Sequence, residues 1–323
     1  MEYRRLGRAG LKLSALSYGA WVTFGRQVDR TAARELLALA YDHGVNYFDN
    51  AETYSAGDAE RVMGAALADL NWPRDSWCVS SKVYFGASTD PRPTQRGLSR
   101  KHVMEACDQA LQRLQVDYLD LYFCHRHDEE TPVDETVWAM DTLIRQGKVL
   151  YWGTSEWPAE RIREAHEVAQ RHHLHAPSME QPQYNLLHRQ RVEREYAPLY
   201  ADFGMGTTTW SPLASGALTG KYAKGVPADS RLNQPGYEWL RDSVLGDEAR
   251  QATVAQFVGI AAGLGVPPAQ LAIAWCLLNP DVSTVMLGAS KTGQLRENLG
   301  ALAVLERLDP AIRQRLGALR ADA

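Results

Sequence analysis

Residues 118–154 read YLDLYFCHRHDEETPVDETVWAMDTLIRQGKVLYWGT and hold one complete unit of strand, helix and strand. Tyr118–His125 and Val149–Thr154 are short apolar runs of the kind that forms buried strands. Between them, Asp134–Gln146 has the amphipathic pattern of a helix. Because a helix connects the two runs, they are predicted to be parallel neighbours in one sheet.

The same alternation extends along the chain in both directions. Strands are predicted at Ala15–Gly19, Val45–Asp49, Cys78–Val83, Tyr118–His125, Val149–Thr154, Met179–Gln183, Gly206–Trp210 and Thr284–Gly288. Helices are predicted at Thr31–His43, Ala59–Leu70, Val103–Leu114 after a Ser99 cap, Asp134–Gln146, Ala159–His173, Arg189–Phe203, Pro268–Leu278 and Gln294–Leu305. Eight strands that alternate with helices predict an α/β fold in which a parallel sheet closes into a (β/α)8 TIM barrel.

Two segments lie outside this alternation. Residues 1–14 alternate charged and apolar positions around Gly10, which predicts an N-terminal β-hairpin. Ser215–Gly246 is rich in Gly, Pro and Ser and predicts a long loop after strand seven, at the rim where barrels carry their active sites. No linker or short repeat divides residues 1–323, so a single domain is expected.

Composition excludes several classes of protein. The 323 residues are 45% hydrophobic and carry a net charge of −4, which argues against a nucleic-acid partner. The four cysteines, far apart and without a CxxC pair, are expected to be buried and reduced. The sequence shows no signal peptide at its start and no apolar run of membrane-spanning length. A cytoplasmic location without direct membrane insertion is therefore expected.

Four polar residues lie at or just beyond the ends of consecutive predicted strands. Asp49 ends strand two, Tyr54 lies in the loop that follows it, Lys82 ends strand three and His125 ends strand four. Strand ends of a closed barrel meet at one rim, so these side chains are expected to lie together. Asp49 would hold Lys82 as an ammonium, which would lower the pKa of the Tyr54 phenol and make it a proton donor near neutral pH. His125 would share that hydrogen bond or orient a carbonyl oxygen.

A purely structural role is the alternative for each of these residues, and it is common for a lone Asp or Tyr at a strand end. A lysine inside an apolar strand is different, because burying an ammonium without a partner is costly. The set of four therefore favours a catalytic site. His172, His173 and His175 lie at a polar helix end and are expected to be solvated, so no metal site is predicted. GxGxxG, P-loop, HExxH and GxSxG motifs are absent from the sequence.

The stretch FDNAETY at Phe48–Tyr54, together with Lys82 and His125, resembles the Asp-Tyr-Lys-His tetrad of the aldo-keto reductase superfamily. The similarity extends from about Tyr3 to Leu305 and is greatest to the branch of the voltage-gated potassium channel β-subunits and their bacterial relatives. Motifs shared with that branch are WVTFG (21–25), GLSRKH (97–102), YWGTS (151–155), WSPLASG (210–216), LAIAWCL (271–277) and LGAS (287–290).

The resemblance implies that NADP(H) binds across the mouth of the barrel. It assigns the nicotinamide end to Trp21, Gln27, Asp49, Ser155, Gln181 and Trp210, and the pyrophosphate to Ser211, Pro212, Leu213 and Ser215. It further assigns a phosphate clamp to Lys221 and Arg231, and the adenosine end to Gly288, Ser290, Gln294, Glu297 and Asn298. The residues themselves agree, since Ser290 precedes a predicted helix whose N-terminus, with Lys291 and Arg296, suits the 2′-phosphate of NADPH.

Three positions depart from the branch. The channel subunits carry Asn where this chain has His125, and commonly Arg where it has Glu156. Asp229 replaces a Tyr of their phosphate clamp, which would loosen cofactor retention. Because Glu156 stands where the branch has Arg, one contact to the carboxamide of the cofactor is not expected to be conserved. The Glu156 carboxylate could instead shape the substrate pocket. His125 completes the reductase tetrad and favours turnover.

Three functions are compatible with these features. The resemblance favours an NADPH-dependent reductase of aldehydes and ketones, with Tyr54 as general acid. A redox-sensing, channel β-subunit-like binding protein with little turnover is the alternative, and Lys82 as a Schiff-base lysine is a third possibility. The branch implies a homo-oligomer, a tetramer or octamer.

The substrate is expected to be a small carbonyl compound. Trp21, Tyr84, Phe85 and Trp157 near the mouth suggest an apolar or aromatic aldehyde. Arg92 and Arg96 leave room for an anionic one.

Overall fold

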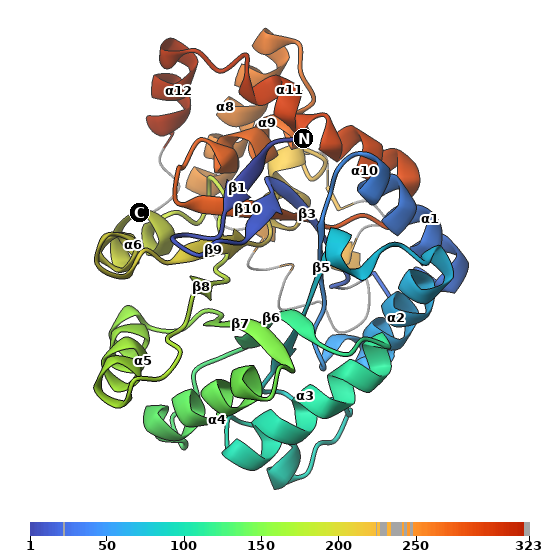
Figure 1. Cartoon of the computed structure of the whole chain (residues 1–323). Helices are drawn as coiled ribbons and strands as arrows, with labels where there is room; N and C mark the ends of the chain where they lie inside the picture. Colours follow the sequence, from blue (N-terminus) through green and yellow to red (C-terminus); the bar gives the residue numbers. More distant parts are fainter. Residues whose placement is uncertain are drawn as a thin grey trace.

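The computed structural model describes residues 1–21, 23–223, 225–226, 231–233, 241, 244–245 and 248–319. Within these residues, parallel strands close into a barrel in the order β10-β3-β4-β5-β6-β7-β8-β9 (Figure 1). The strands are β3 (Leu16–Gly19), β4 (Tyr47–Asp49), β5 (Cys78–Val83), β6 (Leu119–Cys124), β7 (Val149–Thr154), β8 (Met179–Glu180), β9 (Gly206–Thr209) and β10 (Val282–Leu287). The eight predicted strands and the predicted (β/α)8 barrel are confirmed.

Helices surround the barrel on its outside (Figure 1). They are α1 (Arg30–Asp42), α2 (Asp58–Leu70), α3 (Arg100–Leu114), α4 (Val133–Arg145), α5 (Ala159–His172), α6 (Ala197–Phe203), α8 (Glu248–Leu264), α9 (Pro268–Leu277), α10 (Thr292–Leu299), α11 (Ala301–Leu305) and α12 (Pro310–Gly317). The Ser99 side chain accepts a hydrogen bond from the N–H of His102, which confirms the predicted cap of α3.

The N-terminal hairpin closes one end of the barrel. It consists of β1 (Tyr3–Arg5) and β2 (Lys12–Ser14), which pair antiparallel as predicted. Leu6 and Leu13 are buried among side chains of the barrel interior, such as Phe123. Gly7, with φ +55°, lies so close to the chain before β9 that a Cβ there would be 2.2 Å from the carbonyl oxygen of Gly204. With this end covered, the opposite, C-terminal end of the barrel remains for a site.

The helix predicted over Arg189–Phe203 is interrupted. A single π-helical turn, η4 (Arg191–Glu195), is followed by the separate helix α6. Pro198 explains the break, because it has no N–H to donate within a helix and its ring clashes with the carbonyl four residues earlier.

The helix predicted over Gln294–Leu305 also divides, at Gly300, into α10 and α11. The Gln270 side chain of α9 donates a hydrogen bond of 2.8 Å to the carbonyl oxygen of Glu297. A Cβ at Gly300 would lie 2.6 Å from the same side-chain nitrogen, so glycine permits this approach.

The long connection between β9 and β10 has more structure than the predicted loop. The described part includes the short 3₁₀ helices η5 (Ala214–Thr219) and η6 (Arg231–Asn233), and then α8 and α9. The sequence analysis missed α8 because its apolar residues are not confined to one face, which weakens the periodic signal.

Two other expectations concern burial. Cys78, Cys107, Cys124 and Cys276 are buried and free, as expected. Among the described residues, no single helix is long and apolar enough to span a membrane; α8 and α9 reach that length and composition only together, across a bend of 99°.

Candidate active site

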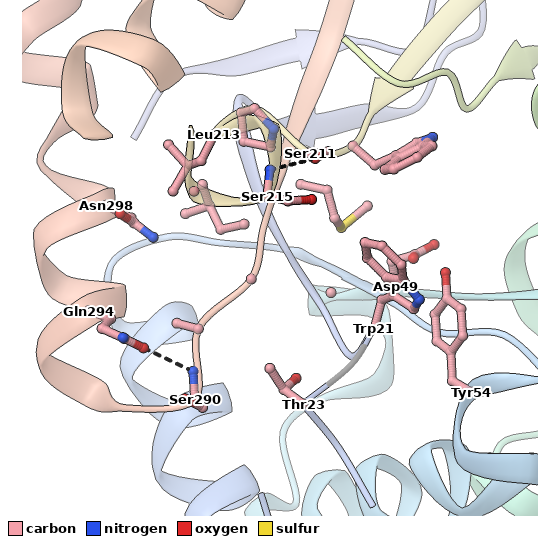
Figure 2. Close-up of a pocket in the computed structure, with 18 of the residues that line it drawn as sticks. Trp21, Thr23, Asp49, Tyr54, Ser211, Leu213, Ser215, Ser290, Gln294 and Asn298 are labelled. Carbon is pink, nitrogen blue, oxygen red and sulfur yellow. Dashed lines mark hydrogen bonds between the residues drawn. The ribbon is translucent and has the colours of Figure 1, made fainter. Parts of the chain in front are cut away.

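A cavity of about 810 Å³ opens at the C-terminal end of the barrel. In Figure 2, Asp49 and Tyr54 lie at one end of it, and Ser290, Gln294 and Asn298 lie at the other. The volume falls within the range of pockets that hold drug-sized ligands and cofactors.

The cavity gathers most of the residues that the sequence singled out. It is lined by Trp21, Gln27, Asp49, Tyr54, His125, Ser155, Gln181, Trp210, Ser211, Pro212, Leu213, Ser215, Lys221, Gly288, Ser290, Gln294, Glu297 and Asn298. Lys82 lies beneath the lining and is fully buried. Arg231 begins η6, and Asp229 lies outside the described residues.

Lys82 connects the carboxylate and the phenol. Its Nζ lies 2.6 Å from Asp49 Oδ2, 2.7 Å from the carbonyl oxygen of Asn50 and 3.2 Å from Tyr54 Oη. Burial lowers the pKa of Lys82, while the neighbouring charge of Asp49 acts in the opposite direction. Since all three donor positions of this buried amine are used, the geometry does not favour Lys82 as a Schiff-base nucleophile.

Asp49 is held by three further donors. Its Oδ1 accepts hydrogen bonds from Ser80 Oγ at 2.7 Å, from Gln181 Nε2 at 3.1 Å and from Tyr47 Oη at 3.2 Å. These donors come from β5, from the residue after β8 and from β4. The carboxylate is therefore fixed in the barrel wall, and it fixes Lys82 in turn.

An unusual local backbone presents the Tyr54 side chain to the cavity. Ser55 and Ala56, which follow it in η1 (Tyr54–Gly57), have φ values of 51° and 53°, in the left-handed region. The Ser55 hydroxyl donates a hydrogen bond of 2.9 Å to the carbonyl oxygen of Phe24. Such conformations are costly for residues other than glycine and gather at functional sites.

The expected lowering of the pKa of Tyr54 is not found. Burial raises this pKa well above the ordinary value of 10, and the charge of Asp49 adds to the increase. The expectation took Asp49 only as the partner that keeps Lys82 charged, whereas burial and the direct charge of Asp49 both raise the pKa of the phenol. The phenol therefore keeps its proton at neutral pH, as a proton donor must.

His125 supplies an imidazole beside the phenol. Its ring centroid lies 5.9 Å from that of Tyr54 and 5.2 Å from that of Phe85. Burial lowers the pKa of His125 well below 6.5, so the ring is neutral at physiological pH. Its Nδ1 is buried and has no hydrogen-bond partner among the described residues. His125 as a residue lines the cavity, where its ring can contact a ligand.

Two side chains near Asp49, those of Gln181 and Trp210, can contact a ligand that carries an amide group and a ring. Gln181 uses its amide N–H groups toward Asp49 at 3.1 Å and Thr208 Oγ1 at 3.2 Å, which leaves its carbonyl oxygen as an acceptor. Trp210 lies beside Trp21, with ring centroids 5.7 Å apart. These donor, acceptor and ring positions fit the carboxamide and ring of a nicotinamide.

Glu156 does not point into the cavity as a free carboxylate. Its Oε1 accepts hydrogen bonds from the Trp210 indole N–H at 3.1 Å and from the Gln183 N–H at 2.5 Å. Its Oε2 lies 2.6 Å from Arg191 Nη1. Glu156 is not among the residues that line the cavity, and its carboxylate instead holds the edge of Trp210, which does line it. That Glu156 could shape the substrate pocket stays a prediction.

The backbone is also unusual where the resemblance places the pyrophosphate. Ser211, Ala214 and Ser215 have φ values of 58°, 46° and 54°. Gly216 follows, and a Cβ there would lie 2.5 Å from Cε of Lys221. The Lys221 side chain thus passes close to Gly216, where any larger residue would displace it. A turn of this kind with an ammonium beside it suits a phosphate.

At the far end of the cavity, the N–H of Ser290 has a hydrogen-bond partner within the chain. It donates to Gln294 Oε1 at 3.3 Å, and Lys291 is the residue that precedes the first turn of α10. Lys291 and Arg296 are exposed, and among the described residues neither forms an ion pair.

The expected mouth residues are placed differently from one another. Trp21 and Phe85 line the cavity, whereas Tyr84 packs against Phe85 outside the lining and Trp157 is buried against His127. Further lining residues, which the sequence did not single out as binding residues, are Gly19, Thr23, Arg26, Thr53, Ser55, Arg126, Gly216, Thr219, Ala269, Ile273, Met286, Leu287 and Ala289. Of these, Arg126 directly follows His125 and opens the loop of residues 126–131, one of the loops from which the sequence predicts the pocket to be built.

Arg92 and Arg96, which the sequence offered for an anion, are exposed and lie outside the lining.

Comparison with known proteins supports a common origin for this site. A probable voltage-gated potassium channel subunit beta from Oryza sativa subsp. japonica is 51% identical over 320 residues, which cover 99% of this chain and 96% of the relative. A protein of the same description from Arabidopsis thaliana is 49% identical over 313 residues, 97% of this chain and 94% of the relative.

The family model described as aldo/keto reductase matches residues 15–316, from the first barrel strand to α12. Proteins of that family are oxidoreductases that generally bind a nicotinamide cofactor. The barrel, the cavity at its C-terminal end and these similarities agree, and the chain belongs to the aldo/keto reductase family.

Proposed function

We propose that the protein is an NADP(H)-dependent reductase that converts aldehydes and ketones to alcohols. The observation that carries the proposal is the buried Lys82 ammonium, which contacts both Asp49 and the Tyr54 phenol at the wall of the cavity. A lysine is seldom fully buried unless its charge is paired, because taking an ammonium out of water is costly.

The residues of the chain divide the work as follows. When bound, the nicotinamide supplies the hydride that reduces the carbonyl carbon. Tyr54 donates its proton to the carbonyl oxygen, which completes the alcohol. Lys82 stabilises the phenolate that this transfer leaves, and Asp49 keeps Lys82 charged. The neutral imidazole of His125 donates a hydrogen bond that orients the carbonyl oxygen toward Tyr54.

The cofactor would lie along the cavity. Ser155, Gln181 and Trp210 would hold the nicotinamide end, and the turn at Ser211–Ser215 with Lys221 would hold the pyrophosphate. The exposed cations Lys291 and Arg296 beside the far end favour NADPH over NADH, since only NADPH carries a 2′-phosphate.

A second candidate is supported by the names of the two plant relatives, which are described as probable potassium channel β-subunits. In this case the protein would bind the cofactor and report its redox state to a membrane partner. The His125 imidazole favours the reductase, because it can orient the carbonyl oxygen of a substrate beside Tyr54.

The two candidates differ in turnover. NADPH absorbance at 340 nm is followed with the purified protein and a panel that includes 4-nitrobenzaldehyde and methylglyoxal, and NADH is tested in parallel. The reductase predicts NADPH oxidation that depends on the carbonyl compound. Tight NADPH binding without oxidation by any carbonyl would favour the β-subunit-like role.

A further inference from the structure

A cation stands at the substrate end of the cavity. Arg126 follows β6 directly after His125, is half-buried and lines the cavity. Its Nη1 donates to the carbonyl oxygen of His125 at 2.5 Å, and its guanidinium carbon lies 5.7 Å from the ring centroid of Phe85. A guanidinium has five N–H donors, so this contact orients the group and leaves most of its donors for another partner.

The charge of Arg126 is not balanced locally. Among the described residues, no carboxylate forms an ion pair with it. The nearest carboxylate of the tetrad, Asp49, is bound to Lys82 at 2.6 Å. The charge of Arg126 acts to lower the pKa of Tyr54, against the larger raising effects of burial and Asp49, and it adds to the lowering of the pKa of His125 by burial and Lys82. Because Asp49 is paired with Lys82, among the described residues it does not compensate the charge of Arg126.

The position of Arg126 separates it from the proposed cofactor contacts. It adjoins His125 and Phe85, and the His125 ring lies beside that of Tyr54. Figure 2 shows Tyr54 at one end of the cavity and Ser290, Gln294 and Asn298 at the opposite end. A substrate whose carbonyl oxygen meets Tyr54 and His125 would therefore bring its remaining atoms toward Phe85 and Arg126.

We propose that Arg126 binds a carboxylate of the substrate, so that the preferred substrates are aldehydes or ketones that carry a carboxylate group. Phe85, whose ring is 36% exposed, offers an apolar surface to the carbon framework between the two groups. A guanidinium suits this task because its planar donors match the two oxygens of a carboxylate. The inference rests on the proposed reductase function and adds the substrate class to it.

The test uses two aldehydes that differ mainly in charge, 4-carboxybenzaldehyde and 4-nitrobenzaldehyde, with NADPH as the reductant. We expect the wild type to prefer the carboxylate. Arg126→Gln is expected to lower kcat/KM for 4-carboxybenzaldehyde about 10- to 100-fold, mainly through KM, as the loss of a charge-assisted hydrogen bond implies. The kcat/KM for 4-nitrobenzaldehyde is expected to change less than about 3-fold, well below the effect of losing one charge-assisted hydrogen bond.

Two further variants act as controls. Arg96→Gln makes the same charge change on an exposed side chain outside the cavity and is expected to leave both substrates unaffected. Arg126→Lys keeps the positive charge but loses the planar pair of N–H donors that can bind both carboxylate oxygens. It should retain part of the preference for 4-carboxybenzaldehyde. It also serves if Arg126→Gln fails to fold, which circular dichroism would show.

Benzoate binding, followed by quenching of tryptophan fluorescence, gives a readout that does not require turnover. Saturable quenching that Arg126→Gln abolishes would support the anion site, and quenching unaffected by that variant would overturn it. Equal kinetic losses with both aldehydes, or no loss, would also overturn it. Wild-type protein that turns over neither aldehyde but binds benzoate through Arg126 would contradict the reductase function alone.

Discussion

The carboxylate of Glu156 accepts a hydrogen bond of 3.1 Å from the indole N–H of Trp210, at the edge of a ring that lines the cavity. Glu156 is itself anchored by Arg191 at 2.6 Å and stands in a left-handed conformation, with φ of 58°. Glu156 thus fixes the position of the Trp210 ring through a hydrogen bond. Under the proposed function it is a positioning residue for the ring that would contact the nicotinamide.

Replacement of Glu156 is expected to weaken cofactor binding. Glu156→Leu removes the acceptor of the Trp210 indole and of the Gln183 N–H, so we expect the Kd for NADPH to rise about 10-fold, the equivalent of one lost hydrogen bond. Glu156→Gln keeps an acceptor oxygen and should show a smaller rise. Fluorescence titration with NADPH measures both, and Glu160→Gln, exposed in α5, is the control. An unchanged Kd in Glu156→Leu would contradict this role.

Glu180 makes the stability of the fold depend on pH. Burial raises the pKa of this carboxyl from 4.5 to about 8, and it contacts Thr154 Oγ1 and the N–H of Glu156. Between these two pH values the folded state holds a proton that the unfolded state has released. The resulting stabilisation is fully present below pH 4.5 and is lost as the pH rises toward 8, by about 1.4 kcal/mol per pH unit.

Glu180→Gln tests this dependence, because its amide reproduces the donor and acceptor of the protonated carboxyl. We expect the free energy of unfolding of the variant to exceed that of the wild type increasingly between pH 5.5 and 8.5. Urea denaturation at several pH values measures the difference. Parallel curves for the two proteins would show that Glu180 is ionised in the folded state.

Asp49 and Lys82 are expected to depend on each other for stability. The ion pair is 2.6 Å long, with the two side chains 4% and 0% exposed. Asp49→Asn or Lys82→Met alone leaves one buried charge unpaired, and each should cost about 3–5 kcal/mol of unfolding free energy.

The double variant Asp49→Asn/Lys82→Met should recover much of that loss while remaining inactive, because no buried charge is left unpaired. Urea unfolding of the four proteins provides the comparison. Additive losses in the double variant would indicate that the two residues contribute independently.

Periodicity alone was enough to predict the barrel, since most of its strands are apolar or β-branched runs between amphipathic segments. The break at Pro198 has a local signal in the proline itself, whereas the break at Gly300 depends on the approach of Gln270 from another helix. Such contacts between segments far apart in sequence have no local signal.

The candidate site shows the same division. Asp49, Tyr54, Lys82 and His125 could be found because each lies at or just beyond a strand end, and strand ends of a barrel share one rim. The rise in the pKa of Tyr54 could not be foreseen, since it depends on how deeply the loop buries the phenol. The binding of Glu156 to Trp210 likewise depends on a backbone conformation that residue types do not specify.

The most direct test of the central claim is the effect of Tyr54→Phe on NADPH oxidation with 4-nitrobenzaldehyde. In the proposed function the Tyr54 hydroxyl, which contacts Lys82 at 3.2 Å, protonates the carbonyl oxygen. Its removal should therefore leave the Kd for NADPH within about 2-fold and lower kcat by about 10²-fold or more. Tyr84→Phe makes the same change outside the cavity lining and should retain activity. Near-normal turnover by Tyr54→Phe would show that another group supplies the proton.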